Sequence, residues 1–279
     1  MLTMKSDAPR PSIGVFDSGF GGLTVLKELV AQYPNADYLY FGDTARLPYG
    51  SKSAETVAKY AVEAAHFLEQ QGADLLVIAC NTATALALER ITTAAHVPVV
   101  GVVEPGAERA SSASKNRRIV VVGTEATISS HAYRRALEVR GAQVREKACP
   151  LLVPLVEEGW VDHPVTEEVA GIYLNEAFAD GFADADVLVL GCTHYPLIKP
   201  VLARTAPLHV TLVDSAHSTA RVVAKQMMNQ PVAIEAKSSS TNGPGLRFFA
   251  TDSVEKFKRL GPRFLGHPVD HVEHVDLKE

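Results

Sequence analysis

The sequence has few cysteines and no long apolar run. Only three cysteines occur in 279 residues, and their odd number and wide spacing exclude a disulfide framework; no CxxC or His/Cys cluster has the spacing of metal ligands. No apolar run approaches the length of a membrane span, and the polar, proline-containing residues 1–12 lack the apolar core of a signal peptide. We therefore expect a cytoplasmic protein with free thiols and no metal site.

A strong charge of one sign is also missing. The net charge is −5, and the 27 basic residues are scattered without a run of five or six, which leaves no electrostatic footprint for nucleic acid or an anionic membrane. Neither is expected as a partner. The hydrophobic content of 47% allows one large core or two ordinary ones, and the length slightly favours two domains.

Apolar, β-branched runs alternate with amphipathic helical patterns along the chain. Continuous apolar strands between such helices indicate parallel sheets covered on both faces, so the fold class is α/β. The polar stretch 236–245 is expected to be a loop, and the tail after Gly266 to be irregular. Strands are expected at 12–18, 37–43, 74–80, 97–103, 118–124, 187–193, 210–216 and 246–251.

The chain contains an internal duplication. ADLLVIACNTAT (73–84) and ADVLVLGCTHYP (185–196) are identical at five of twelve positions, and two further pairs of segments follow the same order with offsets of 106 to 112 residues. We expect two pseudo-symmetric domains, each a mainly parallel sheet flanked by helices: 1–101 plus 214–279, and 102–213. Residues near 102 and 213 should then lie close together. Ligands bind beyond the carboxyl ends of parallel strands, so the active site is expected at the domain interface.

Each of the two duplicated strands ends in a cysteine. Backbone N–H groups at the start of a following helix would lower the pKa of Cys80 and Cys192 below about 8.5. The polar residues after them suit a substrate with carboxylates and an amine, although helix capping and a packed surface histidine explain them as well. Cys149 lies outside the duplicated pattern and is expected to be structural. The polar residues are Asn81, Thr82, Thr193 and His194.

Two glycine-containing turns also follow strands. FDSGFGG (16–22) resembles a phosphate cradle but is neither a Walker loop nor GxGxxG, because Thr24 stands where the third glycine belongs. Its Asp17 and Ser18 stand at the end of a strand, where a carboxylate can pair with an ammonium group or position the proton of a thiol. GDTARLPYG (42–50) is a compact turn that contains Tyr49 and Gly50.

Four segments, VFDSGFGG, YFGDTARLPYG, ACNTAT and GCTHYPL, resemble in this order the signatures of bacterial glutamate racemases, in the cofactor-independent Asp/Glu racemase family. The resemblance covers about residues 12–216. It implies a two-base racemisation of L-glutamate to D-glutamate that supplies peptidoglycan synthesis, in which Cys192 takes the proton from L-glutamate and Cys80 from D-glutamate. The substrate contacts it implies are Asp17, Ser18, Tyr49, Gly50, Asn81, Thr82, Thr124, Thr127, Thr193 and His194.

The same resemblance leaves some points open. Glutamates after a PLVEE-like segment assist in this family, which implies Glu157, although Glu158 is adjacent. Asp17 would tune the proton of Cys80, and His194 that of Cys192. His131 stands where several family members carry asparagine, which affects its surroundings and not the reaction.

Two other functions compete with this interpretation. A related two-cysteine racemase would act on aspartate, but its second motif more often reads GCTE than the GCTH found at 191–194. A binding module would have kept the fold and lost catalysis, and the presence of both thiols argues against it. No cofactor is expected, and the oligomeric state stays open, with a homodimer as one candidate.

Overall fold

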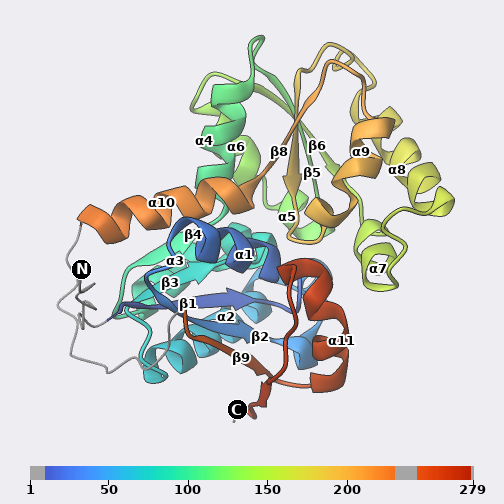
Figure 1. Ribbon diagram of the computed structural model, residues 1–279. Coiled ribbons are helices and arrows are strands. Elements are labelled where there is room, and N and C mark those ends of the chain that lie inside the picture. Colours follow the sequence, from blue (N-terminus) through green and yellow to red (C-terminus); the bar gives the residue numbers. More distant parts are fainter. Residues whose placement is uncertain (1–9, 230–243, 278–279) are drawn as a thin grey trace, which may run out of the picture.

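Two parallel sheets form the framework of the computed structural model, which describes residues 10–229 and 244–277 (Figure 1). The expectations for residues 1–9 and for 236–243 lie outside this range. One sheet has the order β10-β9-β2-β1-β3-β4 and the other β6-β5-β7-β8. The strands are β1 Ser12–Asp17, β2 Asp37–Gly42, β3 Leu75–Ile78, β4 Val99–Gly101, β5 Arg118–Gly123, β6 Gln143–Ala148, β7 Val187–Gly191, β8 Thr211–Asp214, β9 Leu246–Ala250 and β10 Glu273–His274.

Helices cover both faces of each sheet (Figure 1). We call the six-stranded sheet with α1, α2, α3 and α11 the first unit, and the four-stranded sheet with α4 to α9 the second unit. The helices are α1 Leu23–Gln32, α2 Ala54–Gln70, α3 Asn81–Ala94, α4 Val103–Ala113, α5 Glu125–Ser129, α6 Ala132–Glu138, α7 Leu152–Glu157, α8 Pro164–Ala177, α9 Lys199–Thr205, α10 Ser215–Asn229 and α11 Val254–Leu265, with 3-10 turns η1 Thr44–Arg46, η2 Tyr49–Ser51 and η3 Tyr195–Ile198.

The strand order confirms the duplication. The core of the first sheet, β2-β1-β3-β4, has the same order as the whole second sheet, β6-β5-β7-β8. The predicted apolar runs all form strands, with ends a few residues shorter. The two strands that precede Cys80 and Cys192, β3 and β7, hold the same position, so each cysteine leaves its sheet at an equivalent point.

The sequence did not predict strand β6. Its residues, QVREKA, are mostly half-exposed at the edge of the second sheet, so they lack the apolar run of a buried strand and carry the charges that protect sheet edges. The duplication contained the missing signal, because β2 begins at Asp37 and β6 at Gln143, an offset of 106. The tail after Gly266 is also not wholly irregular, since β10 pairs with β9.

The two chain crossings between the units lie side by side. Helix α4, which follows β4, contacts β8, and α10, which follows β8, contacts β4, α4 and α1. Figure 1 shows α10 along the boundary between the two sheets. His217 of α10 is hydrogen-bonded to Gln32 and paired with Glu28, both on α1. The return crossing is therefore fixed to the first unit.

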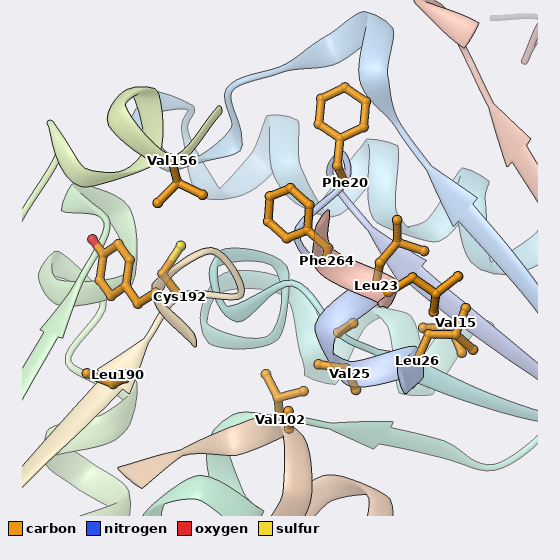
Figure 2. Close-up of a cluster of buried hydrophobic side chains, with 14 of the residues drawn as sticks. Val15, Phe20, Leu23, Val25, Leu26, Val102, Val156, Leu190, Cys192 and Phe264 are labelled. Carbon is orange, nitrogen blue, oxygen red and sulfur yellow. The ribbon is translucent and has the colours of Figure 1, made fainter. Parts of the chain in front are cut away.

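One apolar cluster extends through both units and passes close to the second cysteine. Figure 2 shows Cys192 with Val156 and Leu190 of the second unit and with Phe20 and Phe264 of the first. These side chains are almost entirely buried. The side of Cys192 that packs into this cluster is therefore apolar. Among residues 10–229 and 244–277, no helix is both long and apolar enough to cross a bilayer.

Candidate active site

A cavity of about 420 Å³ lies at the carboxyl ends of four strands, two from each unit. In the first sheet Phe16 pairs with Ile78, and in the second Gly123 pairs with Gly191, so the residues just after these strands leave each sheet at the same level. Eleven residues singled out from the sequence line the cavity: Ser18, Tyr49, Gly50, Cys80, Asn81, Thr82, Thr124, Glu157, Cys192, Thr193 and His194. Asp17 and Thr127 are buried behind it, and their direct contact with a substrate stays a prediction.

The Cys80 thiol lies at the start of α3, beside Ser18. Its sulfur caps α3, accepting from the Ala83 N–H at 3.5 Å, and its thiol lies 3.5 Å from the Ser18 Oγ. Burial, and then the negative charge of Asp17, raise the pKa of Cys80 to about 12 against these hydrogen bonds. The expected acidification by the helix start is therefore wrong for Cys80, because desolvation outweighs the N–H donors.

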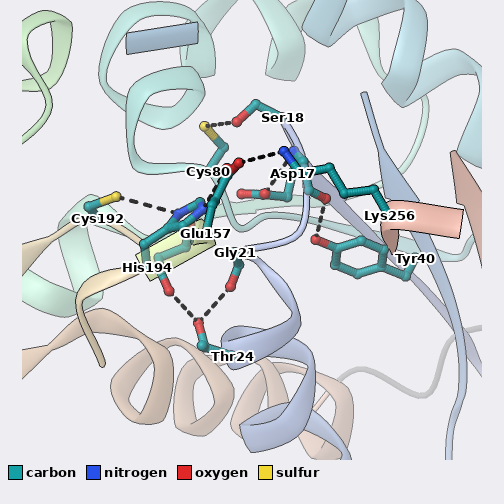
Figure 3. Close-up of polar contacts among 12 residues, drawn as sticks. Asp17, Ser18, Gly21, Thr24, Tyr40, Cys80, Glu157, Cys192, His194 and Lys256 are labelled. Atoms are coloured by element: carbon teal, nitrogen blue, oxygen red, sulfur yellow. Dashed lines mark hydrogen bonds and ion pairs between the residues drawn. The ribbon is translucent and has the colours of Figure 1, made fainter. Parts of the chain in front are cut away.

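Cys192 begins a chain of polar contacts that crosses the cavity (Figure 3). Its Sγ lies 3.9 Å from the His194 Nδ1, and the His194 Nε2 lies 3.3 Å from the Glu157 Oε1. The Glu157 Oε2 accepts from the Lys256 Nζ at 2.8 Å. A 3-10 turn, η3, and not an α-helix follows Cys192, so the adjacent imidazole, and not a helix start, is its charged partner.

The charges along this chain favour an ionised His194 and Glu157. Burial lowers the pKa of His194, but hydrogen bonds to Cys192 and Glu157 raise it to about 10. Burial raises the pKa of Glu157, whereas hydrogen bonds from His194 and Lys256 lower it to about 2. Glu157 contacts His194, whereas Glu158 is exposed at the edge of the cavity, and the assisting role of Glu157 stays a prediction.

Asp17 lies next to the first thiol and is buried behind the cavity wall. Its Oδ2 accepts from the Gly19 N–H at 2.9 Å, and its buried Oδ1 has no hydrogen-bond partner among the residues that the structure describes. Burial raises the pKa of Asp17, while the nearby His194 lowers it. An unpaired buried carboxylate oxygen is costly, and its position suits an ammonium group or a proton that arrives with a substrate.

Two groups of side chains between the units offer hydrogen bonds. The Oδ1 of Asn81 accepts from the Tyr133 hydroxyl at 2.7 Å, and the buried Asn81 Nδ2 has no partner within the described part of the chain, so it can donate to a ligand. The hydroxyl of Thr82 is 2.9 Å from that of Thr124 and 3.2 Å from that of Thr127. These donors can bind a carboxylate. Tyr133, which orients Asn81 from α6, had no signal in the sequence.

At the two glycine-containing turns, the backbone of the first unit lies very close to side chains of the second. A Cβ on Gly21 would lie 2.2 Å from the Thr193 Oγ1 and 2.6 Å from the His194 Nδ1, and one on Gly50 would lie 2.9 Å from the Thr124 Cβ. The turn at 16–22 is thus packed against Thr193 and His194, the two residues that follow Cys192. The hydroxyl of Tyr49 donates to the Asp43 Oδ2 at 2.5 Å, so this residue offers the cavity its ring and backbone.

The sequence reasoning missed Lys256, a lining residue on α11 outside the region of resemblance. His131 lies away from the cavity: it has a positive φ of 54° and pairs with Glu146 at 2.6 Å. Asparagine, which the resemblance implies at this position in several family members, tolerates this conformation well. Within the described part of the chain, no group of three or more His, Cys, Asp or Glu side chains could hold a metal ion.

The duplicated α/β units and the two thiols that share one cavity define a class, the two-cysteine amino-acid racemases. The chain belongs to the Asp/Glu/hydantoin racemase family, whose model matches residues 13–223. It is 61% identical to the glutamate racemase of Koribacter versatilis over 96% of this chain and 98% of the relative. Within the family it therefore groups with the glutamate racemases.

The solved structures agree with this grouping. The crystal structure of the glutamate racemase of Francisella tularensis in complex with D-glutamate superposes with a TM-score of 0.86, at 37% identity, over 96% of this chain and 98% of that one. The aspartate racemase of Picrophilus torridus reaches a TM-score of 0.57 at 17% identity, over 78% of this chain and 94% of that one. The second comparison shows a shared fold alone.

Proposed function

We propose that this protein is an isomerase that interconverts L- and D-glutamate by two-base proton transfer without a cofactor. The observation that carries the proposal is the pair Cys80 and Cys192, which line one cavity from opposite units. Racemisation removes the α-hydrogen from one face of the carbon and returns a proton to the other, so two acid/base groups on opposite sides are the minimal apparatus. The glutamate racemases among its relatives support the choice of substrate.

The surroundings of the thiols support different starting roles. Cys80, with its raised pKa, is a thiol that can donate a proton. Cys192 faces an imidazole that is positively charged when protonated, which stabilises a thiolate. With L-glutamate, Cys192 then takes the α-proton and Cys80 delivers one to the opposite face; with D-glutamate the roles reverse. This direction agrees with the one that the family resemblance implies.

The remaining site residues bind the substrate in this proposal. The free Asn81 Nδ2 and the hydroxyls of Thr82 and Thr124 donate to carboxylates, and such donors stabilise the carbanion-like transition state. The wall of the cavity is completed by Ser18, Tyr49, Gly50 and Thr193. Thr127 orients the hydroxyls of Thr82 and Thr124, and Asp17 pairs with the ammonium group of the substrate. His194 and Glu157 tune the proton of Cys192.

The domain bounds and the cellular setting are parts of the same proposal. We assign 1–101 plus 214–279 to the first domain and 102–213 to the second; the pairing of β9 with β2 supports this division. Hydrogen exchange that protects these two sets as separate cooperative groups would test it. D-glutamate made in the cytoplasm would supply peptidoglycan synthesis, and sedimentation would show whether the chain forms a homodimer.

The decisive experiment is conversion of L-glutamate in D2O by purified protein without added cofactor, followed by chiral chromatography and mass spectrometry. The deuteron delivered to the second face comes from a thiol that has exchanged with solvent. D-glutamate formed early should therefore carry deuterium, whereas the remaining L-glutamate should stay largely protiated.

Other outcomes separate the alternatives. Early, equal labelling of both enantiomers would indicate a single base and contradict the paired thiols. Turnover of aspartate in preference to glutamate would favour the aspartate racemase. Binding of glutamate with no exchange or inversion would favour a module that has lost catalysis.

A further inference from the structure

Helix α11 touches the Cys192 side of the cavity from the opposite unit. Its Lys256 donates to Glu157 of α7, and its Phe264 ring packs edge-on against the His194 ring at 5.2 Å. Glu157 and His194 both belong to the second unit, whereas α11 packs in the first against α1. The chain of contacts from Cys192 through His194 and Glu157 therefore ends on a helix on the other side of the cavity (Figure 3).

Lys256 is held in place at both ends of its side chain. Its backbone lies beside Phe257, which is fully buried and packs against Phe20 and Tyr40. Its Nζ lies 5.4 Å from the centre of the Phe20 ring and 2.8 Å from the Glu157 Oε2. The face of an aromatic ring attracts a cation, so the Phe20 ring is a second favourable contact for the ammonium group. The two contacts together hold the ammonium group at Glu157.

We propose that Lys256 is a positioning residue of the reaction: it binds Glu157 across the cavity and thereby fixes the carboxylate that orients His194 beside Cys192. The proposal deepens the racemase function and rests on it. When the units separate, Glu157 loses this partner, His194 loses a fixed carboxylate, and the Cys192 thiolate loses its oriented counter-charge. Cys192 can therefore act as a base only while the two units are in contact.

Burial sets the strength of the Lys256–Glu157 pair. The side chain of Glu157 is 16% exposed and that of His194 8%, whereas that of Lys256 is 40% exposed. The Lys256–Glu157 pair is therefore stronger than a surface pair and weaker than a fully buried one. Lys256→Met removes a positive charge from this chain of contacts and releases the carboxylate that orients His194, so Cys192 loses its fixed imidazole partner. Asp17, Cys192 and the exposed Glu158 are the other ionisable groups nearby.

The variants include a matched control on the same helix. Lys256→Met removes the charge and keeps an apolar stem, and Lys256→Gln is a second neutral variant in case methionine lowers the melting temperature. Lys256→Arg keeps the charge. Lys258→Met makes the same change in net charge, but the Lys258 Nζ pairs with the exposed Glu255 at 3.1 Å, away from the cavity.

The first readout is alkylation of a single thiol by iodoacetamide as a function of pH. In a Cys80→Ala/Cys149→Ala background Cys192 is the only cysteine of the chain. We expect Lys256→Met to slow its alkylation at pH 7 about tenfold and to move the midpoint up by about one pH unit. Lys258→Met should leave the profile unchanged, and Lys256→Arg should restore most of the rate. In a Cys149→Ala/Cys192→Ala background, Cys80 should not respond to Lys256→Met.

The second readout is steady-state racemisation by the three-cysteine chain. We expect Lys256→Met to lower kcat/KM about tenfold, equally in both directions, because the two enantiomers have equal free energy. The loss should shrink as the pH rises, since at higher pH the Cys192 thiol ionises without the help of Lys256. A loss of the same size at every pH would make Lys256 a substrate-binding residue and overturn the proposal.

The two readouts distinguish failure of the positioning role of Lys256 from failure of the proposed racemase function. An unchanged Cys192 alkylation profile in both neutral variants overturns the positioning role, even if racemisation falls. An equal effect of Lys258→Met also overturns it, because the effect would then come from net charge. If the unmodified chain does not racemise glutamate while Lys256→Met still slows Cys192 alkylation, the proposed function fails and the positioning of Cys192 by Lys256 stands.

Discussion

Gly21→Ala tests whether the two units must touch for the reaction to proceed. A Cβ at this position would lie 2.2 Å from the Thr193 Oγ1, and atoms in real structures do not approach a Cβ closer than 3.0 Å, so the two must separate by at least 3.0 − 2.2 = 0.8 Å. Neither neighbour yields easily. Threonine is short and β-branched, and the His194 ring is held by Glu157 and Phe264.

A displacement near 1 Å in a positioned catalytic group costs about 100-fold in rate, equivalent to about 2.7 kcal/mol of transition-state stabilisation. We therefore expect Gly21→Ala to lower kcat/KM about 100-fold for both enantiomers, as followed by the change in circular dichroism of glutamate. The far-ultraviolet spectrum should remain native, because the clash lies between the units and is relieved by their separation.

Gly171→Ala is the matched control. Gly171 lies inside α8, and a Cβ there would meet nothing within 4 Å. Alanine in a helix interior is more stable than glycine by about 0.8–1.0 kcal/mol, so this variant should be more stable and equally active. Retention of more than half the activity in Gly21→Ala would refute the argument from close approach.

Three further outcomes are expected. Cys80→Ala and Cys192→Ala should each abolish racemisation, whereas Cys149→Ala should keep most of it; comparable loss in the folded Cys149 variant would overturn the assignment of the thiols. Added pyridoxal phosphate should leave the rate unchanged. Exhaustive dialysis against a chelator should also leave it unchanged, and a drop after this dialysis would reveal a required metal. Because the folded pKa of His194 is raised to about 10, its charge stabilises the fold fully below the unfolded value of about 6.5, and this contribution is lost as pH rises through 10. The gap in melting temperature between the unmodified chain and His194→Gln should thus narrow from pH 6.5 to 10, and a constant gap would contradict the raised pKa.

Sequence periodicity predicted the strands that are buried on both faces and failed at an edge. The apolar runs that became β1, β3, β5 and β7 have no alternative to the interior of a sheet. β6 carries Arg145, Glu146 and Lys147, because one side of an edge strand faces solvent. Its existence follows from topology, since the copy of β2 must pair with β5 as β2 pairs with β1.

The site was predictable where strands end and unpredictable where the units meet. A parallel sheet brings residues after its strands to one edge, so Ser18, Cys80 and Cys192 could be placed together from their positions alone. Lys256 reaches Glu157 across 99 residues of chain, and no local pattern encodes that contact. The pKa of Cys80 also could not be inferred, because the desolvation that dominates it depends on how the two units close over the thiol.

The duplication preserved the positions of the two thiols but not their partners, and this asymmetry has a kinetic consequence. Ser18 and the start of α3 surround Cys80, whereas His194 and Glu157 accompany Cys192. Under the proposed starting roles, the empty enzyme is the form that accepts L-glutamate, and D-glutamate must bind a minor form in which the proton has moved from Cys80 to Cys192. Binding to a minor form raises the apparent dissociation constant by the inverse of its population. The ratio kcat/KM must be the same in both directions, so we expect D-glutamate to show both the higher KM and, by the same factor, the higher kcat. Initial rates with each pure enantiomer measure this directly, and equal KM values, or a lower KM for D-glutamate, would show that the two thiols are poised alike despite their different neighbours.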